Sequence, residues 1–347
     1  MTKIPNAPPD NIFAIDLNPY RSFLVDLPPR GTVGMRRVHD GWTGVVSEVS
    51  GNHAQYGDRA GITVTDFNKF VAYNGQYSQI LAQLPPVVKA VEVLKESLAH
   101  VDHQRHRLVT QFATAAEDHA ALEGGDPTLL TAYEKTIAYR GIIADKAAKT
   151  RKKNEEAKKN GGEATGAAAP AEPAAPAAPD APAEGTGKAG QSTSRIANAP
   201  PENIFAINLN PLRDFLVDLP AGATKGMRQE QEGWEDVRQE IVANQSRYGD
   251  RAGITTSDFD KFVALNGQYA QILEPLPVVE KAKEVLEESL ANVDHLRHKL
   301  VTRFADAAEE HAKSEGGDPT LLTAYEKTIA YRSVIADKAV KTRQSKG

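Results

Sequence analysis

The amino-acid sequence contains the same segment twice, and this repeat constrains the fold more than any other feature. Ile4–Arg151 aligns with Ile196–Arg343 without a gap, and 103 of the 148 aligned positions are identical. The run Gly124–Arg140 recurs unchanged as Gly316–Arg332. So close a repeat predicts two copies of one structure rather than the weakly similar units of a solenoid. We call Ile4–Arg151 copy one and Ile196–Arg343 copy two.

A segment of low complexity separates the two copies. Gly161–Ser194 contains no aromatic and no large aliphatic side chain, so it has too little apolar surface to offset the entropy lost on ordering. Its alanines and prolines favour extended, polyproline-like conformations. The sequence therefore predicts a first repeat over 1–153, a flexible linker over 154–194 and a second repeat over 195–347.

Apolar residues in each copy recur at helical spacing. In Val87–Leu122 they follow steps of three and four residues, a heptad-like stripe typical of a coiled-coil seam. The pair Gly124-Gly125 then predicts the end of this helix. Asp126 and Pro127 have the residue types of an N-cap and a first helical position, so another helix is expected to begin there.

Two more helices are expected earlier in each copy. One covers about 35–55, and the next begins at Thr63 or Thr65 and ends at Pro85-Pro86, because proline interrupts helix hydrogen bonding. The first thirty residues, framed by proline pairs, are expected to form an arm across the helices. The predicted fold class is all-α: a tandem duplication of a roughly four-helix bundle with a Pro-bounded N-terminal arm, joined by a disordered Ala/Pro-rich linker.

Composition excludes several classes of function. The chain has no cysteine, which excludes disulfides, thiolate catalysis and cysteine-based zinc sites. Its net charge of −5 argues against general binding of polyanions. The first residues lack the basic and apolar regions of a secretory signal, and no run of 18 apolar residues is present. A cytoplasmic location without membrane contact is therefore expected.

Two histidines three residues apart are the best candidates for metal chemistry. The candidate ligands are His103, His106 and Glu96 in copy one, and His295, His298 and Glu288 in copy two. Imidazole and carboxylate groups on one helix face can bind a divalent transition metal, and carboxylate-bridged bundles use a Glu-x-x-His spacing. Here the motif is Asp-His-x-x-His, and its face is opposite the apolar stripe. A solvated polar face without a cofactor is the favoured interpretation.

The shared motif GDRAGIT is a candidate interaction site. Asp58 and Arg59 in copy one, with Asp250 and Arg251 in copy two, are suited to binding an anion or the carboxylate of a partner. The motif lacks the lysine and the spacing of a phosphate-binding loop. Its glycines are explained by a tight turn between helices.

Four polar residues lie on or beside the apolar stripe of the long helix: Arg105 and His119 in copy one, and Arg297 and His311 in copy two. A buried arginine is costly unless a carboxylate pairs with it. Glu134 and Asp145 are the candidate partners of Arg105. Fixing the helix register is the favoured role of such pairs.

Two tethered copies without a convergent catalytic set favour a non-enzymatic bivalent scaffold or adaptor. The expected partners are proteins, including subunits of a larger assembly, and the copies are also candidates for an intramolecular pseudo-dimer or a homo-oligomer. Copy one has a net charge of −1 and copy two of −6, which predicts different partners or different faces of one partner. The alternatives are a metal-binding bundle and weak nucleic-acid association through 146–159, which Glu155 and Glu156 interrupt.

Overall fold

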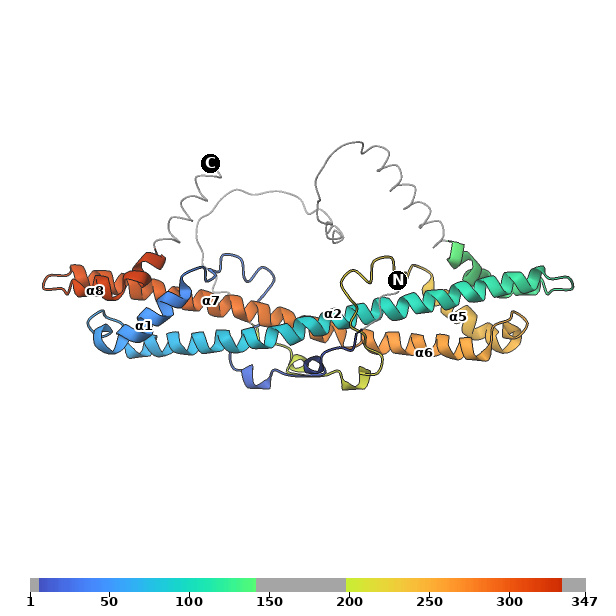
Figure 1. The fold of residues 1–347 in the computed structure, drawn as a ribbon, viewed down its shortest axis with the longest axis horizontal. Helices are drawn as coiled ribbons and strands as arrows, with labels where there is room; N and C mark the ends of the chain where they lie inside the picture. Colours follow the sequence, from blue (N-terminus) through green and yellow to red (C-terminus); the bar gives the residue numbers. More distant parts are fainter. Residues whose placement is uncertain (1–5, 142–197, 333–347) are drawn as a thin grey trace, which may run out of the picture. The chain divides into compact units, whose positions relative to one another are not determined.

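The computed structural model describes residues 6–141 and 198–332 (Figure 1). Of the residues in these two ranges, 67% are helical and 4% are in strands, so the prediction of a mostly helical fold is confirmed. Within the two described ranges, no helix is both long and apolar enough to cross a membrane. The predicted linker 154–194 and the basic segment 146–159 lie outside these ranges.

The elements of copy one are η1 (Asp10–Ile12), β1 (Ala14–Asp16), η2 (Asn18–Tyr20), α1 (Trp42–Tyr56), α2 (Val64–Ala121) and α3 (Thr128–Ala132). Those of copy two are η3 (Glu202–Ile204), β2 (Ala206–Asn208), η4 (Asn210–Leu212), α5 (Trp234–Asn244), the π-helix η5 (Gln245–Gly249), α6 (Thr256–Leu273), α7 (Leu276–Lys313) and α8 (Thr320–Ala324). Helical turns resume over 134–141 and 326–332.

The chain forms two compact units, and each unit contains parts of both copies. Unit 1 comprises Met1–Ser97, Arg195–Gly222 and Gln271–Gly347, and unit 2 comprises Leu98–Ser194 and Ala223–Ala270. The repeat in the sequence and the compact units are therefore different divisions of the chain. The boundaries 1–153 and 195–347 remain a prediction about the sequence.

The core of unit 1 joins the first half of copy one to the second half of copy two. In Figure 1 the blue α1 lies beside the red α8. Trp42 and Phe70 from copy one pack in one cluster with Phe304, Tyr325 and Tyr331 from copy two. The rings of Phe70 and Phe304 meet edge to face with centroids 5.8 Å apart. Aromatic side chains of this size contribute strongly to core stability.

Unit 2 repeats this arrangement with the copies exchanged. Phe262 meets Phe112 edge to face, also at 5.8 Å between ring centroids. Trp234 packs against Phe262 and against Tyr139, in the same way that Trp42 packs against Phe70 and its partner tyrosine. Each bundle therefore buries residues of one copy against residues of the other.

The N-terminal arms pair with each other within unit 1. Strands β1 and β2 are antiparallel, and Ile15 pairs with Ile207, its own counterpart in the repeat. Two isolated bridges extend this reciprocal pattern: Asn6 with Asp218, and Asp26 with Asn198. A residue that meets its own counterpart is typical of a two-fold, isologous interface.

The predicted helix end at Pro85-Pro86 is wrong for copy one. Both prolines lie inside the continuous helix α2. Proline removes one backbone donor and crowds the preceding turn, which favours a break. Ile80 and Val87, on either side of the pair, are fully buried, but so are their counterparts Ile272 and Val279, so burial of these side chains does not distinguish the two copies.

In copy two the helix does break, but earlier: α6 ends at Leu273 and α7 starts at Leu276, directly after Pro275, which stands where copy one has Gln83. Pro277, the counterpart of Pro85, lies inside α7.

The capping predictions are confirmed, but one helix starts late. Thr63 Oγ1 accepts a hydrogen bond from the Asp66 N–H at 3.1 Å, and Asp126 Oδ1 accepts one from the Thr128 N–H at 3.0 Å. The helix predicted over 35–55 begins only at Trp42. Gly41, directly before it, has φ +94°, a left-handed conformation that a helix cannot include.

Candidate functional site

The two predicted carboxylate ligands each hold an arm of the other copy. Glu96 Oε2 accepts a hydrogen bond from the Leu219 N–H at 2.8 Å, and Glu288 Oε2 accepts one from the Leu27 N–H at 2.7 Å. Partial burial raises the pKa of both glutamate carboxyls. These groups satisfy backbone donors that would otherwise lack a partner in the interface between the copies.

His103 and His295 have the same role. The Nδ1 atom of His103 accepts a hydrogen bond from the Arg228 N–H at 3.3 Å, and that of His295 accepts one from the Arg36 N–H at 3.3 Å. Burial lowers the pKa of both imidazoles, so the neutral, accepting form is favoured. Among the described residues, no group of three or more histidine or carboxylate side chains is arranged to hold a metal ion.

The interpretation of this helix face as solvated is wrong for His106 and His298, which are buried. His106 Nδ1 donates to the Asp102 carbonyl oxygen at 2.8 Å, and Nε2 accepts from the Tyr139 hydroxyl at 3.0 Å. Within the described part of the chain, neither ring nitrogen of His298 has a hydrogen-bond partner. The loops that precede α5 and α1 in the opposite copy cover this face, and a single-helix pattern carries no information about that contact.

Arg105 is the centre of a buried polar cluster in unit 2. Its guanidinium lies 4.1 Å from the ring centroids of both Trp234 and Tyr269, between two aromatic side chains. Nε donates to Asn266 Oδ1 at 3.0 Å, and Nη1 donates to Asp102 Oδ1 at 3.1 Å. Glu230 supplies a second carboxylate, with Oε2 3.3 Å from Nη2.

These partners differ from the expected ones. Asp102 and Glu230 pair with Arg105, whereas Glu134 is not among its partners and Asp145 lies outside the described residues. Asp102 is three residues from Arg105 on the same helix and is a counterpart of Asp294, so the repeat contained a signal for it. Glu230 is aligned with Val38 and had no such signal.

Arg297 forms the corresponding cluster in unit 1 with one carboxylate fewer. It lies 4.5 Å from the ring centroid of Trp42 and 4.1 Å from that of Tyr77, and Nη1 donates to Asp294 Oδ1 at 2.7 Å. Val38 stands where Glu230 stands in unit 2. Burial lowers the pKa of the Arg297 guanidinium and raises that of the Asp294 carboxyl. The two clusters are built from equivalent residues, but the cluster in unit 2 has one more carboxylate.

The GDRAGIT turns also join the copies. Arg59 forms an ion pair with Asp318, and Arg251 forms one with Asp126, so each arginine binds a carboxylate of the opposite copy. Asp58 and Asp250 are exposed.

The seam histidines pack on these same turns. Gly61 and Gly253 have φ +71° and +69°, as the turn prediction requires. His311 lies against Gly61 and His119 against Gly253, so closely that a Cβ atom on either glycine would collide with the imidazole.

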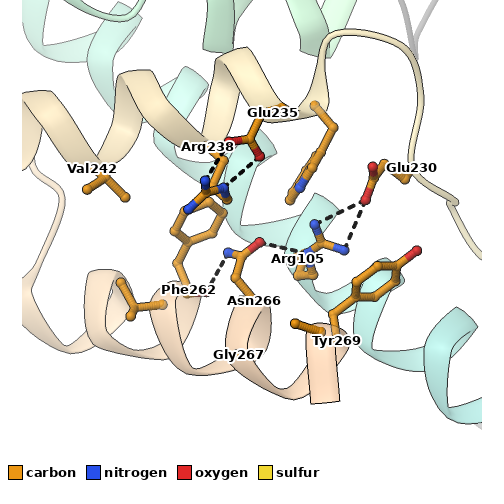
Figure 2. A pocket seen from close by; sticks show the side chains of 12 residues that line it. Arg105, Glu230, Glu235, Arg238, Val242, Phe262, Asn266, Gly267 and Tyr269 are labelled. Carbon is orange, nitrogen blue, oxygen red and sulfur yellow. Dashed lines mark hydrogen bonds and ion pairs between the residues drawn. The ribbon is translucent and has the colours of Figure 1, made fainter. Parts of the chain in front are cut away.

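Unit 2 has a groove between α5 and α6. Figure 2 shows its lining, with Glu235 and Arg238 on α5 facing Asn266 and Gly267 on α6. Its volume is about 520 Å³. Glu235 accepts hydrogen bonds from Arg238 Nε at 2.8 Å and Nη2 at 2.5 Å. This ion pair lowers the pKa of the Glu235 carboxyl to about 2, so the groove keeps its rim charges at neutral pH.

Acidification is expected to destabilise unit 1 through His298. Burial, assisted by the charge of Arg36 and by His39 and His295, lowers the pKa of this imidazole to about 4. Above pH 6.5 the group is neutral in both states. As the pH falls from 6.5 towards 4, the unfolded chain binds a proton that the folded chain refuses, so stability decreases, by about 2–3 kcal/mol at pH 4.5.

Urea unfolding at pH 7.5 and pH 4.5 measures this effect. The chain has two tryptophans, Trp42 in unit 1 and Trp234 in unit 2, so a W234F background reports on unit 1 alone. His298→Leu should remove most of the loss that is specific to unit 1. An equal loss in His298→Leu and in the parent would refute the assignment, and a W42F background provides the control for unit 2.

Comparison with protein-family models, with curated proteins and with solved structures finds no match for this chain.

Proposed function

We propose that the protein is a non-enzymatic, bivalent scaffold that presents two related helical units to protein partners in the cytoplasm. One observation carries the proposal: both units expose the same large apolar side chains at equivalent positions. Unit 1 exposes Val71 on α2 and Leu322 on α8, at 49% and 38%. Unit 2 exposes Val263 on α6 and Leu130 on α3, at 46% and 45%. Repetition at matched positions supports a duplicated binding face.

The polar residues support the same proposal, because their contacts are structural. Carboxylates, imidazoles and guanidiniums that might have formed a reactive site bind backbone amides or side chains of the other copy. Pairing of the two copies within one chain takes the place of a homodimer interface. Two linked faces raise the effective concentration of the second contact, so overall affinity for a multivalent partner can exceed that of one face by 10²–10⁴.

Matched surface variants test the proposal in the full chain. Truncation is unsuitable, because each unit needs both copies. Val71→Ser with Leu322→Ser alters unit 1, and Val263→Ser with Leu130→Ser alters unit 2. The tagged wild type and both variants serve as baits in a native lysate, with quantitative mass spectrometry of the bound proteins. The affinity of the captured partner for each bait is then measured with purified components.

A bivalent scaffold predicts a partner that the wild type retains and that either variant holds at least 100-fold more weakly. A partner held equally by the wild type and by both double variants would refute a role for these faces. A partner lost from only one variant would show a single binding face and refute bivalency.

A further inference from the structure

The groove between α5 and α6 combines an apolar floor with a charged rim. Phe262 is buried at its base, and Val242 and Val263 are exposed by 47% and 46% at its edges. No atom of the described residues lies within 4 Å of the position that a Cβ atom would occupy on Gly267, so a larger side chain at this lining position has open space to enter. Figure 2 labels Gly267 on the α6 ribbon, between Asn266 and Tyr269, and Gly267 is one of the residues that line the groove. Such a groove accepts the apolar ridge of another helix.

The rim carries acidic groups that the equivalent face of unit 1 lacks. Side chains of Glu230 and Glu235 are 41% and 60% exposed at the end of the groove near Arg105. The loop before α5 and its first turn contain four carboxylates in copy two: Glu230, Glu232, Glu235 and Asp236. The aligned residues of copy one are Val38, Asp40, Thr43 and Gly44. The two units therefore have equivalent helices at this site but differ in the number of carboxylates beside it.

We propose that this groove of unit 2 binds a basic amphipathic helix of a partner protein, with its apolar ridge over Val263 and Gly267 and a lysine or arginine at Glu230 and Glu235. The proposal rests on the proposed scaffold function and names the chemistry of one partner.

Charge complementarity selects the basic helix. Glu230 and Glu235 pair with Arg105 and Arg238, but their side chains stay 41% and 60% exposed, and Glu232 and Asp236 add negative charge beside them. At these four positions copy one carries a single carboxylate, Asp40, which explains why only unit 2 has this preference.

The test uses three synthetic helical peptides with the full-length protein. All three carry leucine at alternating steps of three and four residues, and their remaining positions are lysine, glutamine or glutamate. Peptide anisotropy gives the dissociation constant. Trp234 emission in a W42F background places the peptide, because Trp234 lines the groove. The lysine peptide should bind at least tenfold more tightly than the glutamine peptide, and the glutamate peptide should bind most weakly.

Two variants are matched to the geometry. Gly267→Leu adds a bulky side chain to the lining of the groove and should weaken lysine-peptide binding at least 30-fold. Gly75→Leu makes the same change at the equivalent position of unit 1, where nothing lies within 4 Å either, and should leave binding unchanged. Glu230→Val with Glu235→Thr introduces residues that copy one already carries at these positions, and should remove the preference for lysine over glutamine.

Several results would overturn the proposal. Equal affinity for the lysine and glutamine peptides would show that the groove has no preference for a basic helix. An equal effect of Gly75→Leu and Gly267→Leu would place binding elsewhere. A wild-type dimer that Gly267→Leu dissociates would make a second copy of the chain the occupant. Tighter peptide binding after deletion of 146–159 would make the chain's own basic segment the occupant. None of these results decides whether the scaffold binds two partners, which the surface variants test separately.

Discussion

Replacing Asp294 by asparagine is expected to destabilise unit 1 by about 3–5 kcal/mol, because it leaves a buried arginine without its carboxylate. Arg297 is only 4% exposed and pairs with Asp294 at 2.7 Å. Asparagine keeps the shape of the side chain and removes the charge. Val38 supplies no negative charge in its place. The cation–π attraction between Arg297 and its two flanking aromatic rings is weaker than the attraction of the lost ion pair.

Asp102→Asn in unit 2 is the matched comparison. Arg105 retains Glu230 after this change, so we expect a loss smaller by at least about 1 kcal/mol than that of Asp294→Asn. Urea unfolding measures both, with Trp42 emission in W234F for unit 1 and Trp234 emission in W42F for unit 2. Equal losses would show that Glu230 contributes no stability to the cluster. A loss below about 1 kcal/mol for Asp294→Asn would contradict the buried ion pair itself.

Cutting the chain within 161–194 is expected to leave the two copies bound to each other. Both bundles take their cores from both copies: Phe70 packs on Phe304 in unit 1, and Phe262 packs on Phe112 in unit 2. Separating the copies would expose both cores at once, at about 25 cal/mol for each Å² of apolar surface. A protease site inserted in 161–194 tests this in the full-length protein.

After complete cleavage the fragments should co-elute in gel filtration at micromolar concentration and separate only in denaturant. Their unfolding midpoint should then depend on protein concentration, because the intramolecular contact has become a bimolecular one. The uncut protein is the control, and its midpoint should not change with concentration. Fragments that elute separately, each with a cooperative unfolding transition, would show that each copy buries a core of its own.

Local features of the candidate site were predictable. The glycine turns, the Thr63 and Asp126 caps and the need for a carboxylate beside Arg105 all follow from short-range chemistry. The role of His103 and Glu96 was not predictable, because their hydrogen-bond donors are backbone amides more than 120 residues away. Backbone amides have no sequence signature. Periodicity within one helix also cannot show that a loop of the other copy covers the face that it places in solvent.

The sequence by itself determined that the chain holds two copies of one helical segment, that helices begin after Thr63 and after Asp126, and which side chains are apolar enough to be buried. These properties depend on residues within a few turns of one another. Only the tertiary structure decided which copy completes each core. Phe70 and Phe262 are counterparts, as are Phe112 and Phe304, so packing within a copy and packing between copies bury the same side chains. The continuity of α2 through Pro85-Pro86 removes this ambiguity, because an uninterrupted helix cannot fold back on itself and its two halves must find partners in the other copy.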